Sequence, residues 1–448
     1  MITPKTILGF LLFQRASILC VASSNSARWL GLVFVLSAGL AREYDGEYLI
    51  GEPWHLVLPL AASLVGCMAL ALLVGWLSWS RMVRDVSLLT KFAALLNVYW
   101  MTAPMALLYA IPFERFMGPG GATQANLTLL GVISVWRVTL MIRSVSVLFG
   151  ASWVASTMPV MVFCLAIGYA ALKLIPSPVF MLMGGIRLTE SEDIILGTRF
   201  LLIAGGVVTA PIWLIGFLCC CSMKSPWTWQ LRKFEHQNQP VSWTSWVLAL
   251  LSISFLTPVL PRTQHEQWLR WRAEKLLLSG SFDELSKLTH DHSELELPPH
   301  WDPPPRIGYG ETKPELISTT IAIHASKPAD WFWKLYLDKI ERKDNHFGFV
   351  NALSAFDETK LRGFIDLFET LGVSAWQAGQ IDEWIETSLK DQPISQERRE
   401  LLGKIQELCK AELAKSKTRS VHKKPKPRTS PPNVVLPHSS KAKLSSDR

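Results

Sequence analysis

The sequence predicts an all-α membrane protein, in which a polytopic transmembrane bundle of six or seven helices precedes a soluble, all-helical C-terminal region. From Trp29 to Leu260, apolar segments follow one another with almost no acidic residues inside them. After Pro261 the chain becomes rich in charge. Many of the 19 tryptophans lie at segment edges, where indole rings favour the headgroup layer. Residues 29–260 are therefore the predicted bundle.

Residues 1–28 are predicted to form an amphipathic segment on the inner membrane surface. Lys5 followed by Ile7–Phe13 resembles a secretory signal, but Gln14 and Arg15 interrupt its apolar core. A leucine precedes Cys20, where a lipoprotein cleavage site needs a small residue. An uncleaved interfacial stretch is the favoured interpretation.

Seven apolar segments are candidates for membrane crossings, each of which needs about 20 apolar residues. The first is short and the fourth contains Arg137, so the number of crossings depends on whether these two span the bilayer. The candidates are residues 29–41, 55–79, 92–111, 127–142, 153–174, 200–221 and 243–260.

The distribution of lysine and arginine over the connecting segments predicts the orientation. With the N-terminus in the cytoplasm, ten of these residues lie on the inner side and five on the outer side, as the positive-inside rule requires. Seven crossings would then place the C-terminal region outside the cytoplasm, whereas six would leave it inside. The predicted location is the plasma (inner) membrane.

Two features of the bundle are candidate binding sites. Arg137 lies within an apolar segment, where a charge is costly and faces a cavity, a partner or a headgroup, unless it reaches out to the interface. No acidic residue lies inside another segment to pair with it. The acidic loop Glu43, Asp45 and Glu47, with Glu52 and His55 after it, offers ligands for a cation, although such loops are more often simply solvated.

A resemblance to a known family covers residues 136–165. Trp136, Leu140, Gly150 and Ser152 form the pattern W-x3-L-x9-G-x-S, followed by another apolar helix. This pattern resembles that of the Yip-type multi-pass membrane proteins, which form a five-helix bundle. The resemblance implies a membrane-organising or trafficking role without catalytic residues. The predicted number of helices and the long C-terminal region depart from that family.

The C-terminal region begins with a predicted helical hairpin, residues 261–297. Apolar residues recur at helical spacing from Glu266, Gly280 interrupts them, and Asp283 opens a second helix. Residues 298–312 are predicted to be a proline-rich linker, with Trp301 anchoring it to a domain.

Residues 313–417 are predicted to form a soluble helical domain. Five helical patterns occur there, of which 314–324 could also form a short strand, and about 100 residues suffice for a small core. Residues 418–448 are predicted to be a disordered basic tail. Residues 415–448 hold ten lysines and arginines against one acidic residue, which suits anionic lipid or nucleic acid or simply keeps the chain soluble.

No enzymatic motif was found, and no cofactor is predicted. The sequence lacks a phosphate-binding G-x4-G-K-[ST] loop and a G-x-S-x-G nucleophile elbow. His290, His292 and His300 are weak candidates for metal ligands, because no buried scaffold is evident around them. Of the seven cysteines, only Cys409 lies in the predicted soluble region, which excludes a disulfide within it.

The favoured prediction is a non-enzymatic membrane-anchored scaffold or interaction protein. Its partners would be the lipid bilayer and a protein that binds the soluble helical region. A small-solute transporter or channel with Arg137 in its pathway is the first alternative. A membrane enzyme that uses the acidic loop 43–55 is the second.

Overall fold

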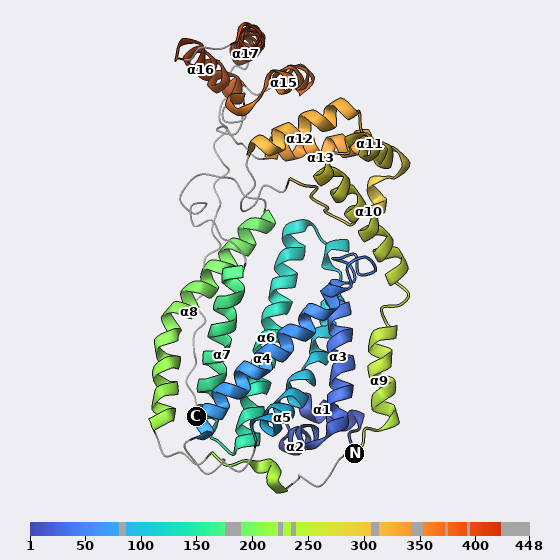
Figure 1. Ribbon diagram of the computed structural model, residues 1–448, viewed down its shortest axis with the longest axis vertical. Coiled ribbons are helices and arrows are strands. Elements are labelled where there is room, and N and C mark those ends of the chain that lie inside the picture. The colour runs from blue at the N-terminus through green and yellow to red at the C-terminus, as the bar shows by residue number, and fades with distance from the viewer. Residues whose placement is uncertain are drawn as a thin grey trace, which may run out of the picture. The chain divides into compact units, whose positions relative to one another are not determined.

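The computed structural model describes residues 1–79, 87–174, 190–222, 227–233, 239–305, 313–342, 353–371, 375–391 and 395–422 (Figure 1). Within these ranges the chain is helical, apart from connections and one isolated bridge between Ile2 and Val241, which confirms the all-α class. The chain divides into two compact units, residues 1–345 and 346–448, which are described separately.

The bundle occupies most of the first unit. Apolar side chains of nearly all its helices share one core. Its elements are α1 (Pro4–Leu11), α2 (Arg15–Ser23), α3 (Asn25–Glu43), α4 (Trp54–Trp79), α5 (Leu88–Trp100), η1 (Ala103–Ala110), η2 (Phe113–Arg115), α6 (Pro119–Phe149), α7 (Trp153–Leu174), α8 (Glu190–Ser222), η4 (Gln230–Lys233) and α9 (Trp243–Ser254).

Five segments of the described chain are long and apolar enough to cross a membrane: Trp54–Leu77, Leu88–Arg115, Pro119–Phe149, Trp153–Ala170 and Asp193–Ser222. The pair α1 and α2, bent by 117°, would make a sixth. Only 6% of the most apolar window of α8 is buried within the protein. Exposing such a continuous apolar face to water would be unfavourable. The structure therefore agrees with the prediction of a multi-pass membrane protein.

Three predicted segments differ from what the structure contains. Segment 127–142 is the middle of α6, a helix of 31 residues, and is long enough to span despite Arg137. Segment 243–260 gives only the 12-residue α9, because Pro258 has no N–H to bond the carbonyl of Ser254 and continue the helix. Segment 29–41 lies in α3, which has 19 residues but is not among the five apolar spans.

The N-terminal segment is packed more deeply than predicted for a stretch on the membrane surface. Ile2, Phe10, Ile18 and Val21 are fully buried in the core of the bundle. The backbone N–H of Ile2 donates to the carbonyl of Pro240, at 2.8 Å. Residues 1–28 are therefore part of the bundle, held against the start of α9.

Contacts between connecting segments define two ends of the bundle. At the N-terminal end, the side-chain amide of Asn97 donates to the carbonyls of Ala22 and Ser24, and Thr228 N donates to the carbonyl of Phe149. At the opposite end, called here the loop end, the hydroxyl of Tyr44 donates to the carbonyl of Ala110 at 2.9 Å. The loop end thus gathers the α3–α4 connection and the start of α6.

Gly150 makes the turn between α6 and α7 at the N-terminal end. Its φ of 60° lies in the left-handed region, and a Cβ there would meet Thr228 Oγ1 at 2.6 Å. The neighbouring Ser152 accepts a hydrogen bond from Ala155 N and so opens α7. The glycine and the serine of the W-x3-L-x9-G-x-S pattern therefore have a local role in ending one helix and starting the next.

The substitution Gly150→Ala should lower the stability of the bundle by about 1–3 kcal/mol, because alanine is strained at positive φ and meets Thr228. The measurement is the midpoint of thermal unfolding of the full-length protein in one detergent. Gly131→Ala in the same helix is the control, since no heavy atom lies within 4 Å of its added Cβ, and it should leave the midpoint unchanged or raise it. Equal midpoints for Gly150→Ala and the wild type would contradict this account.

The rest of the first unit is the helical module, defined as residues 260–305 and 313–342. It comprises α10 (Leu260–Ser279), α11 (Phe282–Asp291), η5 (Glu294–Glu296), α12 (Lys313–Ser326) and α13 (Asp330–Arg342). Gly280 ends α10 at a φ of 72°, as predicted for the hairpin. Residues 314–324 lie in a helix, α12, rather than in the alternative strand.

The module has one core of its own, which also includes the proline-rich segment. Leu269, Leu285, Ile323 and Phe332 come from its four α-helices. Trp301 packs against this core, and its indole N–H donates to Glu274 Oε1 at 3.0 Å, as expected of an anchor. Residues 298–305 are therefore packed on the module, and 306–312 of the predicted linker lie outside the described residues.

The second unit is a smaller helical cluster of α15 (Glu358–Leu371), α16 (Ala375–Asp391) and α17 (Gln396–His422). Asp357 caps α15 through a bond from Lys360 N to Oδ1, at 2.8 Å. Burial raises the pKa of the Cys409 thiol to about 12. The predicted domain 313–417 is thus divided between the units, because α12 and α13 pack on the hairpin.

The start of the predicted tail also differs. α17 continues to His422, so residues 418–422 are helical rather than disordered. Lysine and arginine are good helix formers, and the first residue that breaks a helix is Pro425. Residues 423–448 lie outside the described residues.

Candidate functional site

Polar and charged side chains of several segments meet at the loop end of the bundle. Three side chains on one face of α10 bind the backbone of the α3–α4 connection, and they are named here the α10 clamp: Gln264, Gln267 and Arg270. The side-chain amide of Gln264 donates to the carbonyls of Tyr44 and Glu47. Gln267 donates to the carbonyl of Asp45 at 2.6 Å, and Arg270 to that of Gly46 at 2.6 Å.

The two glutamines of the clamp are buried, and Arg270 is half-buried. Gln264 uses its amide oxygen as well, which accepts from Leu49 N at 2.8 Å. The exposed fractions of Gln264 and Gln267 are 5% and 0%. An unpaired buried polar group costs about 1–3 kcal/mol, so the bonds made by the amide nitrogens and by Gln264 Oε1 favour this packing, although Gln267 Oε1 has no partner among the described residues. The first turns of the module are therefore fixed to the bundle by directional bonds.

Arg115 joins the clamp to the start of α6. Its guanidinium donates to Asp45, with Nε 3.1 Å from Oδ2, and to Glu266, with one terminal nitrogen 2.6 Å from Oε2. The side chain of Glu266 is 5% exposed, and that of Asp45 is 16% exposed. One cation thus pairs with two partly buried carboxylates from separate segments, and Arg262 supplies a second cation to Glu266.

Burial dominates the electrostatics of this network. Desolvation raises the pKa of the Asp45 carboxyl above its ordinary value, although hydrogen bonding to Arg115 opposes the shift. Burial and the charge of Asp45 together raise the pKa of Tyr44 to about 12. The network therefore holds the α3–α4 connection, the start of α6 and α10 together.

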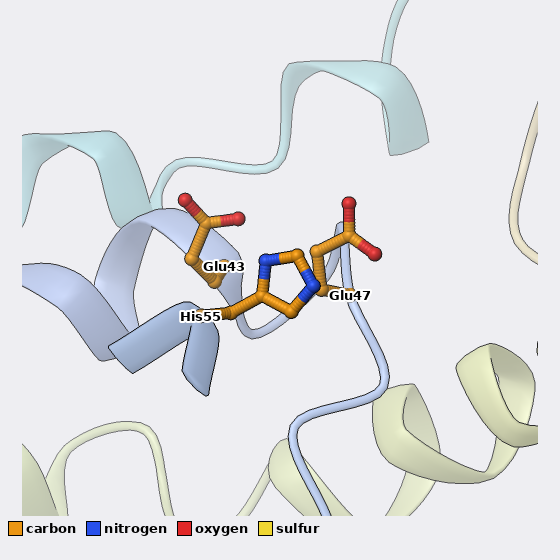
Figure 2. Close-up of side chains that lie close together, drawn as sticks. All are labelled: Glu43, Glu47 and His55. Atoms are coloured by element: carbon orange, nitrogen blue, oxygen red, sulfur yellow. The ribbon is translucent and has the colours of Figure 1, made fainter. Parts of the chain in front are cut away.

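Beside the clamp, three of the predicted binding residues come together (Figure 2). Glu43 ends α3, Glu47 follows in the connection, and His55 is in the first turn of α4. One potential ligand atom from each lies within 4.8 Å of the other two. Figure 2 shows the imidazole of His55 between the two carboxyl groups. Within the described residues this is the one group of three side chains placed to share a metal ion.

Asp45, the fourth residue predicted for this loop, does not join them. It pairs with Arg115 instead. The proximity of these residues in the sequence suggested one acidic cluster. Because the connection turns, Asp45 points to Arg115, whereas Glu43 and Glu47 lie beside His55. The loop thus contains two arrangements, an ion-pair network around Asp45 and an open ligand group around His55.

Arg137 lies in the middle of α6 and contacts α5 and the residue that precedes η1. Its Nε donates to Thr102 Oγ1 at 3.2 Å, and its guanidinium carbon lies 5.8 Å from the ring centroid of Tyr99. Contacts with a hydroxyl and an aromatic face lower the free-energy cost of burying a charge in the middle of an apolar helix. These contacts give Arg137 a packing role.

The three histidines predicted as weak metal candidates do not share a site. The ring of His290 bonds the carbonyl of Ser286 at 2.8 Å, and that of His292 bonds Glu296 at 2.9 Å. His300 bonds the carbonyl of Met117 at 3.3 Å. Each ring thus bonds a different neighbour, and no two of these histidines belong to one candidate ligand group among the described residues.

An open cleft lies between the start of α6 and the proline-rich segment of the module. Its walls mix exposed apolar residues, such as Phe116 and Leu295, with charged ones. The acidic residues along it are Glu114, Glu190, Glu266, Glu294, Asp302 and Asp338, and the basic ones are Arg115, Arg262 and Lys339. A surface of this composition suits a protein segment better than a small apolar ligand.

No protein-family model matches the sequence, and no curated protein or solved structure is significantly similar to it.

The residues of the clamp were not predicted from the sequence. A signal was present in the spacing of Gln264, Gln267 and Arg270, because residues three apart share one helix face. A helix face of long polar side chains beside an apolar stripe indicates a surface that packs against the backbone of another segment.

Proposed function

We propose that this protein is a membrane-anchored interaction protein whose bundle holds the helical module at its loop end, ready for a protein partner. The observation that carries the proposal is the α10 clamp, with Arg115 bridging Asp45 and Glu266. If the module only had to be attached to the membrane, a flexible linker would be enough. Directional bonds to the bundle instead hold the cleft in one orientation beside the membrane.

Seven crossings are the proposed topology, with the N-terminus in the cytoplasm and the module outside it. α9 is short, but Ser242 at its start bonds Ile2 at the N-terminal end, and Leu256 after it packs on Ala41 and Tyr44 at the loop end. The element therefore connects both ends, as α3 does. The excess of basic residues at the N-terminal end and of acidic residues at the loop end supports the same orientation.

The surroundings of Arg137 favour this proposal over a transporter or channel. Its contacts are a hydroxyl and an aromatic ring of a neighbouring helix segment, and ion-coupled pathways use acidic or histidine partners at that depth. A membrane-organising role is also what the resemblance of residues 136–165 to Yip-type proteins implies.

Photo-crosslinking in living cells tests the proposal. A photoreactive amino acid replaces Leu295, which lies in the cleft with 88% of its surface exposed. The expected result is a discrete protein adduct. The matched control replaces Val208, an exposed apolar residue of α8, and should give lipid adducts only. Failure of Leu295 and of a second cleft position, Phe116, to give any protein adduct would refute the interaction role.

A further inference from the structure

Glu43, Glu47 and His55 have an arrangement that goes beyond the proposed interaction role. One polar atom of each side chain contacts a charged residue outside the group. Arg42 Nε lies 3.2 Å from Glu43 Oε1, and Arg270 donates to Glu47 Oε2 at 2.7 Å. His55 Nε2 lies 3.3 Å from Glu52 Oε2.

These outer contacts leave a second ligand atom on every member of the group. Among the described residues, no bond takes up Glu43 Oε2, Glu47 Oε1 or His55 Nδ1. A carboxylate that bonds the far nitrogen of an imidazole is the usual outer partner of a histidine that binds metal. The outer partners therefore orient the three side chains while a free atom of each remains for an ion.

The composition of the group selects the class of ion. Its ligand atoms would be two carboxylate oxygens and one imidazole nitrogen. A nitrogen ligand disfavours Mg²⁺ and Ca²⁺, which prefer oxygen, and suits Zn²⁺ and related transition-metal ions. Ligands of a tetrahedral Zn²⁺ lie about 3.4 Å apart when its bonds are about 2.1 Å long. One ligand atom of each residue lies within 4.8 Å of the other two. Side-chain rotation can shorten these distances, because all three residues are only half-buried.

We propose that Glu43, Glu47 and His55 bind a divalent transition-metal ion of the Zn²⁺ type at the loop end of the bundle. Three protein ligands leave a fourth position for water or for a ligand atom from a partner. Since Glu47 also pairs with Arg270, a bound ion would tie the α3–α4 connection, α4 and the α10 clamp together. The metal would thus stabilise the segment that carries the module.

The experiment is a Zn²⁺ titration of the full-length protein in nanodiscs, stripped of metal and competed against a chromophoric chelator. The expected result is one tightly bound ion per chain, and Co²⁺ in its place should give the visible absorption of a four-coordinate N/O site. His55→Ala should weaken Zn²⁺ binding about 100-fold, and the isosteric Glu43→Gln at least about 10-fold. Glu43→Gln keeps the test valid if His55→Ala fails to fold.

His290→Ala is the matched control, because that exposed histidine bonds only a backbone carbonyl outside the group. Its Zn²⁺ affinity should equal that of the wild type. The proposal is overturned if the wild type binds no ion in competition with the chelator. It is also overturned if Glu43→Gln binds Zn²⁺ as tightly as the wild type, or if His290→Ala loses the ion. None of these outcomes bears on whether the cleft binds a protein.

Discussion

Replacing Arg115 by methionine should destabilise the attachment of α10 to the bundle by about 2–4 kcal/mol. Methionine keeps most of the side-chain volume but leaves Asp45 without its cation and Glu266 with only the exposed Arg262, and breaking a partly buried pair in this way is costly. Hydrogen exchange of the α10 amides is the measurement. A loss of about 3 kcal/mol corresponds to roughly a 100-fold faster exchange by local opening.

Arg262→Met is the matched control for this prediction. Arg262 pairs with the same Glu266, but 76% of its side chain is exposed, so its removal should change exchange by less than about 1 kcal/mol. The effect of Arg115→Met should also shrink as the pH is lowered from 7.5 to 5. Without Arg115 the pKa of Asp45, already raised by burial, rises further, and the folded variant then takes up the proton that removes the repulsion. Equal exchange in Arg115→Met and Arg262→Met would contradict the assigned role of Arg115.

Replacing Phe332 by alanine should destabilise the helical module by about 3–5 kcal/mol, the usual cost of removing a buried phenylalanine. Phe332 is fully buried, and its ring centroid lies 6.0 Å from that of Trp301 and 5.4 Å from that of Tyr336. The loss should therefore loosen the proline-rich segment as well as α13. Limited proteolysis of the full-length protein, followed by mapping of the first cleavages, measures this directly.

The predicted first cleavages of Phe332→Ala lie within residues 281–342, with the bundle left intact. Leu295→Ala is the control, since a side chain that is 88% exposed contributes little to the core, and its digestion should match the wild type. Cleavage confined to the second unit would show that Phe332 does not support a core shared by the hairpin and α13.

The all-helical class and most of the apolar segments were predictable from the sequence, because hydropathy and helical periodicity are local properties. The outcome for α9 shows the limit of that approach. A window of apolar residues ignores Pro258, which ends the helix early. Likewise Arg137 made segment 127–142 look weak, although the hydroxyl of Thr102 and the ring of Tyr99 accommodate its charge.

The candidate site was predicted only in part, because its members come from distant parts of the chain. Glu43, Glu47 and His55 could be named from one short loop. The pairing of Arg115 with Asp45 and with Glu266 could not, since these residues lie 70 and 151 positions from Arg115 in the sequence. The extent of the module could not be predicted for the same reason. Its α13 packs against a hairpin that precedes it by some 40 residues, as the bond from Trp331 to Thr289 shows.

The most direct test of the proposed architecture is the side of the membrane on which each end of the bundle lies. In a cysteine-free background, Glu284→Cys places one thiol on the module and Lys5→Cys places one at the N-terminal end, both at exposed positions. A membrane-impermeant maleimide is applied to intact cells and then to permeabilised ones. Seven crossings predict that Glu284→Cys is labelled in intact cells and Lys5→Cys only after permeabilisation. Labelling of both thiols under the same condition would place the two ends on one side and contradict the account.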